Sequence, residues 1–294
     1  MTRAFFASSA KWLRLPMLVG LALCSSSLMT LAAPASPAPV VESNDILRVC
    51  AANQPPYSIK GGGGFENKIA VVVGEAMGRQ VQFVWSSRPA IYLVQEYLNK
   101  NLCDVVIGLD TNDPRVLTTK PYYRAGYVFI TRTADHLDIH SWSDPRLLKF
   151  DHIAVGFYTP GEEMLKKIGK YDDDFNYEKS LVNFRSARNE YIQVDPARMV
   201  SEVASGNAPI AAAFSPEVAR QVRESSVPLT MTPVDDNTVN ADGQKVPQTF
   251  DQSMGVRKDD SALAAQLNAA LVKAAPDIEA ILKDEGIPLL KPHS

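Results

Sequence analysis

Several groups of residues in this chain have a type and spacing that could support chemistry, and the most suggestive is a short acidic stretch. Oxygen-bearing side chains stand there at every second position, as at the start of a calcium-binding loop: Asp172, Asp174, Asn176 and Glu178. The position of the loop's glycine holds Tyr177, and Asn183 stands where a glutamate would close the loop. We therefore predict an acidic loop that faces solvent and binds no metal.

Residues that often carry catalysis do not assemble into a known motif. His136 and His140 have the spacing of one helical face, but no glutamate base lies beside them. No serine lies in a Gly-x-Ser-x-Gly turn. The glycine run Gly61 to Gly64 precedes a predicted helix, yet it lacks the lysine of a phosphate-binding loop. These patterns do not predict an enzyme, a metal site or a cofactor site.

Aromatic side chains are the better candidates for binding, because they gather at or near the ends of predicted strands. In open α/β sheets, ligands bind outside the carboxyl ends of the strands. Packing in the core explains each aromatic residue about as well when it is taken alone, but as a set they favour a cleft. The set is Tyr57, Phe65, Trp85, Tyr122, Tyr123 and Phe157.

Residues 1–38 have the composition of a secretory signal and its processing region. Three cations open the chain, the mostly apolar stretch Leu15 to Leu31 follows, and small residues around Ala33 offer a cleavage site. Serines interrupt the apolar stretch, which argues against a permanent membrane anchor. Leu23 precedes Cys24 where a lipidation site needs a small residue. We therefore predict export to the periplasm without an anchor.

Removal of this segment leaves an acidic protein. The formal net charge changes from -3 to -3 - 3 = -6, because no Asp or Glu precedes Glu42. Nucleic-acid binding needs clustered Lys and Arg, and the sequence has no such cluster. The acidic surface suits solubility or a cationic partner.

Cys50 and Cys103 remain after the signal is removed. An even pair in an oxidising compartment favours a disulfide. Each cysteine lies at the edge of a predicted strand, and parallel neighbouring strands could bring them within bonding range. Two separate buried thiols are the alternative.

Strands alternate with helices along the chain, which indicates parallel α/β sheets. The continuous apolar run Val105 to Leu109 predicts a strand that is covered on both faces. Ser215-Pro216-Glu217 predicts a helix start with a capping hydroxyl, a proline in the first turn and an acid at the positive end. The other predicted strands are Leu47 to Ala51, Val81 to Trp85, Ile153 to Phe157 and Ile210 to Phe214. The other predicted helices are Ile69 to Met77, Ile91 to Leu98, Glu162 to Ile168, Arg198 to Ala204, Leu263 to Leu271 and, separately, Ile278 to Leu282.

The segment from Leu102 to Phe129 runs through a strand, a polar crossing with Arg115, the turn Pro121-Tyr122-Tyr123 and a second strand. This order resembles the first lobe of a periplasmic solute-binding protein. The resemblance implies a type II periplasmic-binding-protein fold, in which two α/β lobes are joined by a two-crossing hinge. By this resemblance, residues 44–131 plus 250–294 form lobe 1, and residues 132–249 form lobe 2.

Amino-acid-binding members of that fold grip the ligand carboxylate with an arginine before the aromatic turn, and Arg115 is the nearest match. They hold the ammonium with an acid after a strand that resembles Pro209 to Ala213. Phe214 stands at that position here. A phenyl ring cannot replace the charge, so we do not expect amino-acid capture.

A more specific resemblance rests on the words LRVCAANQPPYS, GFENKIA, LCDVVIGL, LTTKPYYRAGYVF and DQSMGVRKDD. They resemble the XoxJ/MxaJ accessory proteins of PQQ-dependent (quinoprotein) methanol dehydrogenases over nearly the whole mature chain. The resemblance implies a periplasmic, non-enzymatic helper of methanol metabolism. It would be monomeric when free, hold no cofactor and bind the large dehydrogenase subunit to assist maturation or activation. We favour the lanthanide-linked XoxJ type over the calcium-linked MxaJ type.

Arg115 and Phe214 belong to the candidates for the cleft or the partner interface. Three further residues join them: Glu66 and Asn67, from the word GFENK, and Asp110, at the end of its strand. Two other classes of function remain open. One is a transporter-linked solute-binding protein for a small polar ligand. The other is a dehydratase on the same fold, for which Glu66 would be the acid that transfers protons.

Overall fold

The computed structural model describes residues 45–182 and 194–292, which belong to one compact unit that begins at Val41. The predicted signal sequence and Asn183 lie outside the described residues. Within those residues, no helix combines the length and the apolar character that crossing a membrane would require.

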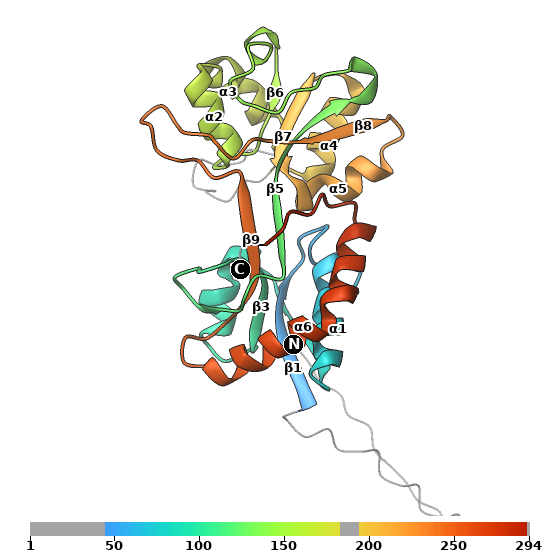
Figure 1. Ribbon diagram of the computed structural model, residues 1–294, viewed down its shortest axis with the longest axis vertical. Helices are drawn as coiled ribbons and strands as arrows, with labels where there is room; N and C mark the ends of the chain where they lie inside the picture. The colour runs from blue at the N-terminus through green and yellow to red at the C-terminus, as the bar shows by residue number, and fades with distance from the viewer. Residues whose placement is uncertain (1–44, 183–193, 293–294) are drawn as a thin grey trace, which may run out of the picture. The chain divides into compact units, whose positions relative to one another are not determined.

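The first lobe is a sheet built from both ends of the chain. β1 runs parallel to β2 and β3, whereas β9 runs antiparallel to β3 and also pairs with the short β4. Helices α1 (Phe65–Ala76) and α6 (Ser261–Asp284) lie side by side against this sheet (Figure 1) and share its largest apolar cluster. The strands are β1 (Ile46–Ala52), β2 (Gln80–Ser86), β3 (Val105–Asp110), β4 (Leu117–Thr118) and β9 (Thr249–Val256).

Both faces of β1 and β3 are covered, because alternate side chains enter two different apolar clusters. Val49 and Val105 pack in the cluster of α1 and α6, whereas Cys50 and Val106 pack with Leu93 and its helical neighbours. Those neighbours belong to η2 (Ala90–Tyr92) and η3 (Val94–Leu98). The predicted coverage of the strand after Cys103 is therefore confirmed.

The second lobe has the same arrangement around β5 and β7. Side chains of β5 alternate between two clusters, with Phe129 in one and Val128 and Ile130 in the other. β7 is antiparallel to β5 and parallel to β6, and β8 pairs with β5. The strands are β5 (Tyr123–Arg132), β6 (Ile153–Ala154), β7 (Ile210–Phe214) and β8 (Leu229–Pro233). The helices are α2 (Pro160–Ile168), α3 (Tyr171–Ser180), α4 (Pro196–Ser205) and α5 (Ser215–Glu224). Two 3-10 turns, η4 (Thr133–Asp135) and η5 (Leu147–Lys149), lie in the long connection after β5.

Two strands connect the lobes. β5 pairs with β9 from Tyr123 to Gly126, and it then pairs with β7 from Tyr127 to Thr131. β9 carries the chain back beside β3 (Figure 1). The lobe boundaries at residues 131 and 250 lie close to the ends of these strands, and we retain them as a proposal.

Three helical segments differ from the sequence-based prediction. The two predicted C-terminal helices form one helix, α6, with Pro276 inside it. Its buried positions, among them Leu267, Leu271 and Ile278, keep helical spacing across the proline, so packing against α1 outweighs the break. The helix predicted at Ile91 to Leu98 consists of the 3-10 turn η2 and the π-helix η3.

The acidic stretch is the third difference, because it is the helix α3 and not a loop. Asp174 and Glu178 are four residues apart on one helical face, and both are fully buried. Their burial removes them from solvent, so the predicted solvent-facing loop is wrong for these two residues.

Candidate ligand-binding cleft

Two cavities that share lining residues lie between residues of both lobes and the strands that join them. We name them the inner cavity, which Glu66 and Asp110 line, and the outer cavity, which Phe157 and Tyr158 line. The inner cavity has a volume of about 360 Å³, and the outer cavity has a volume of about 990 Å³. Tyr57, Ile91, Tyr127 and Glu217 line both. The inner cavity is bounded mainly by β1, β3, β9 and the starts of α1 and α5, so it lies at strand ends, where open α/β sheets bind ligands.

Most of the predicted site residues line these cavities. The inner cavity contacts Tyr57, Glu66, Asn67, Asp110, Arg115 and Phe214, and the outer cavity contacts Tyr57 and Phe157. Phe65 is fully buried in the core against Tyr57, with ring centroids 5.1 Å apart, so its predicted place at the cleft surface is not observed. Neither cavity is lined by Trp85, Tyr122 or Tyr123. Trp85 packs against Phe83, and Tyr122 packs against Tyr123.

Asn67 fixes the loop that carries Tyr57 to the cleft. Its side-chain oxygen accepts hydrogen bonds from the amides of Ile59 (2.8 Å) and Gly64 (3.2 Å). Its amide nitrogen donates to Ser58 Oγ at 3.0 Å. Because Asn67 is buried and these groups occupy it, its main effect is to position the residues around it.

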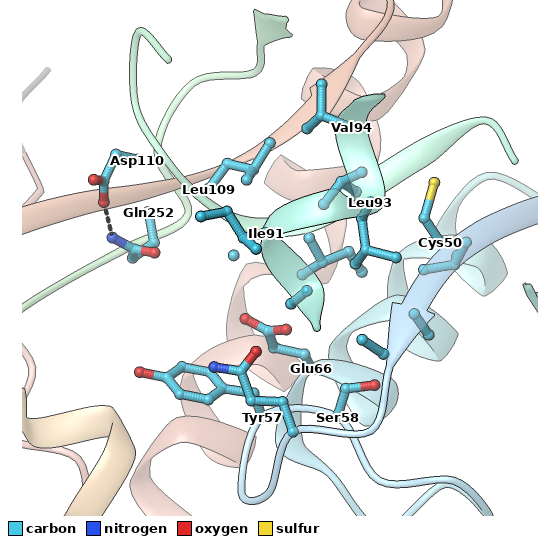
Figure 2. Close-up of a pocket in the computed structure, with 18 of the residues that line it drawn as sticks. Cys50, Tyr57, Ser58, Glu66, Ile91, Leu93, Val94, Leu109, Asp110 and Gln252 are labelled. Atoms are coloured by element: carbon cyan, nitrogen blue, oxygen red, sulfur yellow. Dashed lines mark hydrogen bonds between the residues drawn. The ribbon is translucent and has the colours of Figure 1, made fainter. Parts of the chain in front are cut away.

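Glu66 points from the first turn of α1 into the inner cavity, between Tyr57 and Ile91 (Figure 2). Its amide donates to the Tyr57 carbonyl at 2.9 Å, which ties the helix start to the loop. Its carboxylate lies against Gly108, where a β-carbon would collide with Glu66 Oε1. Gly108 has a φ of 73°, and the pairing of β3 with β9 shifts register around it, so a local irregularity in β3 makes room for the acid. Burial raises the pKa of Glu66 to about 8.

Glu217 enters the cleft from the second lobe, in the first turn of α5. The predicted helix start is confirmed, with Pro216 in the first turn. However, Ser215 is the first helical residue, and its hydroxyl forms no hydrogen bond that would cap the helix. Burial raises the pKa of Glu217 to about 7. We had interpreted this acid only as a partner of the helix dipole. Its position just after the carboxyl end of a strand was the signal for a cleft residue.

Phe214 is part of an aromatic cluster, at the position where the resemblance predicts the acid that holds a ligand's ammonium. Its ring centroid lies 5.6 Å from that of Tyr127 and 5.8 Å from that of Phe250. Apolar surface therefore replaces a charge at this point of the cleft.

Arg115 and Asp110 both form pairs within the cleft. The Arg115 side chain donates to its neighbour Asp113 from Nε (3.0 Å) and from Nη2 (2.6 Å), and this pair lowers the pKa of Asp113. Asp110 accepts a hydrogen bond of 2.8 Å from Gln252 Nε2 (Figure 2). A carboxylate ligand would thus have to compete with Asp113 for Arg115.

Apolar side chains at the outer cavity are unusually exposed. Tyr158 is 79% exposed and Ile91 is 48% exposed. Tyr158 also has a φ of 57°, which is uncommon for an aromatic residue, and its amide donates to Glu162 Oε2. The sequence carried no signal for Tyr158, because its exposure and backbone conformation depend on the fold.

Contacts also describe the cysteine pair and the acidic stretch. Cys50 and Cys103 form the predicted disulfide, with Cα atoms 5.4 Å apart on the neighbouring β1 and the segment before β3. Across residues 45–182 and 194–292, no group of three or more His, Cys, Asp and Glu side chains could hold a metal ion. Asp174 instead accepts from the amide of Ile153 at 3.3 Å and contacts His152 Nδ1 at the same distance.

Comparison with known proteins defines first the class and then the family. The sequence profile of bacterial extracellular solute-binding proteins, family 3, matches residues 47–283. Protein MoxJ of Methylorubrum extorquens is 65% identical over 244 residues, which cover 83% of this chain and 81% of MoxJ.

Two solved structures agree with that result. MxaJ from Methlophaga aminisulfidivorans MPT has a TM-score of 0.79 and 48% identity, and the match covers 83% of this chain and all of MxaJ (100%). The periplasmic binding protein XoxJ from Methylobacterium extorquens AM1 has a TM-score of 0.61 and 28% identity, over 83% of this chain and 99% of XoxJ. The chain has the type II periplasmic-binding-protein fold, and it belongs to the MxaJ/XoxJ family within the solute-binding proteins.

Proposed function

We propose that this chain is a periplasmic accessory protein that binds a quinoprotein methanol dehydrogenase and assists its maturation or activation, without catalysis of its own. The observation that carries the proposal is the 65% identity with MoxJ, together with the family membership. The names of the relatives describe those proteins and do not name a partner of this chain. We infer the dehydrogenase as the partner from the family resemblance.

The chemistry of the cleft supports a macromolecular partner. Phe214 occupies the position of the ammonium-binding acid, and Arg115 is already paired with Asp113. Tyr158 and Ile91 expose apolar surface at the outer cavity. Exposed aromatic anchors at the rim of a cavity are typical of protein interfaces, where a few such residues dominate the binding energy.

The identities also bear on the type of partner. The chain is 48% identical to MxaJ but 28% identical to XoxJ, so our sequence-based preference for the lanthanide-linked XoxJ type has no support here. We propose the MxaJ type, for which the resemblance implies a calcium-linked dehydrogenase.

The experiment is to mix the exported protein with its cognate dehydrogenase and to measure co-elution and methanol oxidation. We expect co-elution and a higher yield of active dehydrogenase. The variant Tyr158→Ala should weaken binding at least tenfold, and Phe175→Ala is the matched control because Phe175 is exposed but lines neither cavity. Absence of association and of any effect on activity would contradict the proposal.

One observation favours a second candidate. A buried acid with a pKa near neutrality, such as Glu66, suits the proton transfer of a dehydratase. Turnover of a hydroxylated substrate that is lost in Glu66→Gln would support an enzyme.

A further inference from the structure

The inner cavity contains carboxylates that lack a partner. Glu66 and Glu217 line it from opposite lobes, and neither side chain forms a hydrogen bond or an ion pair with any described residue. Arg115 is the single cation among the described residues that line the inner and outer cavities, and Asp113 holds it. The acids therefore face a cavity whose walls offer them no free counter-ion.

A buried hydroxyl group that does not itself line the cavity is influenced by the same acids. Tyr123 is only 2% exposed, and its hydroxyl has no hydrogen-bond partner. Burial raises the pKa of Tyr123 well above its usual value, and the negative charges of Glu66, Asp110 and Glu217 raise it further. A buried hydroxyl without a partner is uncommon and calls for a missing donor or acceptor.

Tyr57 adds a second hydroxyl to this group. Burial raises the pKa of Tyr57, and the charges of Glu217, Tyr123 and Glu66 raise it further, in that order. Figure 2 shows Tyr57, Glu66 and the pair of Asp110 and Gln252 around one space. Two carboxylates and the side chain of Tyr57 thus line a cavity of about 360 Å³, whose remaining walls include the apolar Ile91 and Leu109.

We propose that this group of residues binds the basic side chain of a lysine or arginine from the partner protein, with Glu66 and Glu217 as the counter-ions. An ammonium or guanidinium group on an apolar stem matches both halves of the site, because the charge meets the acids and the stem meets the apolar walls. The inference rests on the proposed function, which makes the dehydrogenase the source of the basic side chain. The chemistry of that side chain is inferred from the cavity.

The ionisation of the acids is consistent with this ligand. Glu66 has its pKa raised to about 8 and Glu217 to about 7, in both cases by burial. A bound cation favours the charged form of a carboxyl group, so its arrival would release protons. The titratable groups that face the two acids are Tyr57, Tyr122, Tyr123, Tyr127 and Asp110.

The first part of the test uses small probes. Nα-acetyl-lysine amide and Nα-acetyl-arginine amide, which keep their cationic side chains, are titrated by NMR against the exported protein. Nα-acetyl-norleucine amide is the uncharged control. We expect at least one cationic probe to bind ten times more tightly than the norleucine probe. The double variant Glu66→Gln and Glu217→Gln should lose this difference.

The matched control is Glu75→Gln with Glu224→Gln, which removes the same charges from exposed positions of the same two helices. This control should bind as the wild type does, and thermal melts verify that each variant is folded. Equal binding of cationic and uncharged probes, or binding that the cleft variants leave unchanged, would overturn the inference.

The second part separates this inference from the proposed function. If the wild-type protein co-elutes with the dehydrogenase and the cleft double variant does not, both are supported. If the double variant co-elutes as well as the wild type does, the inference fails and the proposed function stands. If the wild type does not co-elute, the proposed function fails and so does the assignment of the basic side chain to the dehydrogenase. A charge-dependent probe result would then identify a free amine as the ligand.

Discussion

Two groups of carboxyl groups in this protein have raised pKa values, but they face different surroundings. The cleft acids, Glu66 and Glu217, border the inner cavity, and burial raises their pKa values to about 8 and about 7. The α3 acids, Asp174 and Glu178, are fully buried, and burial raises the pKa of Glu178 to about 8. A raised pKa therefore does not mark a binding site by itself, and access to a cavity separates the two groups.

The two α3 acids differ in their hydrogen bonds. Asp174 accepts from the amide that starts β6, at Ile153, whereas Glu178 has no hydrogen-bond partner for either oxygen. The charges of Glu162 and Asp174 raise the pKa of Glu178 further after burial. We conclude that Glu178 destabilises the fold when it is ionised, whereas the cleft acids can be stabilised by a ligand.

The largest expected effect tests the loop that positions the cleft acids. A β-carbon at Gly64 would collide with the backbone carbonyl of Tyr57, which cannot move freely because Glu66 donates to it. We expect Gly64→Ala to lower the free energy of unfolding by about 3 kcal/mol. Gly63→Ala is the neighbouring control, since a β-carbon there meets only the Ile59 side chain at 3.8 Å. Equal stability of the two variants in urea unfolding would show that the loop is not packed as described.

The next effect distinguishes the α3 acids from the cleft acids. Removing the buried charge in Glu178→Gln should raise the free energy of unfolding by about 2 kcal/mol at pH 8, with a melting temperature about 4 to 8 °C higher. The pKa of Glu178 in the folded protein lies above its usual value of 4.5. The wild-type protein therefore becomes less stable as the pH rises from 4.5 to about 8, because Glu178 ionises more readily in the unfolded chain.

The pH dependence provides the control for that prediction. The gain in Glu178→Gln should vanish near pH 4.5, where the wild-type carboxyl is protonated. Glu66→Gln should give a smaller gain at pH 8, because Glu66 is only partly buried at the edge of a cavity, where solvent screens its charge more than that of the fully buried Glu178. Thermal melts across this pH range measure both, and a gain for Glu178→Gln that does not depend on pH would contradict the account.

Gly108 tests the position of Glu66 with a smaller change in stability. Gly108→Ala and Gly243→Ala both place a β-carbon at a positive φ, at 73° and 79°, so each should cost about 1 kcal/mol. In Gly108→Ala alone, the new methyl group displaces the Glu66 carboxylate. The affinity for the cationic probe should therefore fall at least tenfold in Gly108→Ala and stay unchanged in Gly243→Ala. The same affinity in both variants would mean that Glu66 lies elsewhere.

The smallest change in stability concerns Tyr158. Because its φ of 57° suits glycine better than an aromatic residue, Tyr158→Gly should change the free energy of unfolding by no more than about 1 kcal/mol. Its affinity for the dehydrogenase, measured by calorimetry, should nevertheless fall at least tenfold. A large loss of stability would show that the side chain packs within the lobe.

Much of the fold could be predicted from local patterns. The continuous apolar run after Cys103 and the helix start at Ser215 gave strands and helices in the right places, and the resemblance supplied the two-lobed arrangement. The prediction for α3 was wrong, because the alternating acids indicated a loop. The burial of Asp174 and Glu178 depends on tertiary packing, which the local pattern does not contain. The prediction of two C-terminal helices was wrong for the same reason. Contacts with α1 outweigh the helix-breaking tendency of Pro276, so α6 is continuous.

The cleft could be predicted only in part. Tyr57, Glu66 and Phe214 follow from the strand-end rule and the family words, and the structure brings them to one cavity. Glu217 was missed although the same strand-end rule applies to it, because the acid also suits the positive end of a helix. Tyr158 could not be predicted, because its exposure depends on one unusual backbone conformation. Phe65 and Trp85 show that an aromatic residue near a strand end can belong to the core or to a neighbouring surface.

Hydrogen exchange on the complex with the cognate dehydrogenase tests the central claim most directly. We predict that the dehydrogenase protects the segments that line the cleft, at residues 54–66, 89–94 and 156–159, and leaves the middle of α6, around the exposed Val272, unchanged. A complex in which these segments exchange as fast as in the free protein would contradict recognition through the cleft.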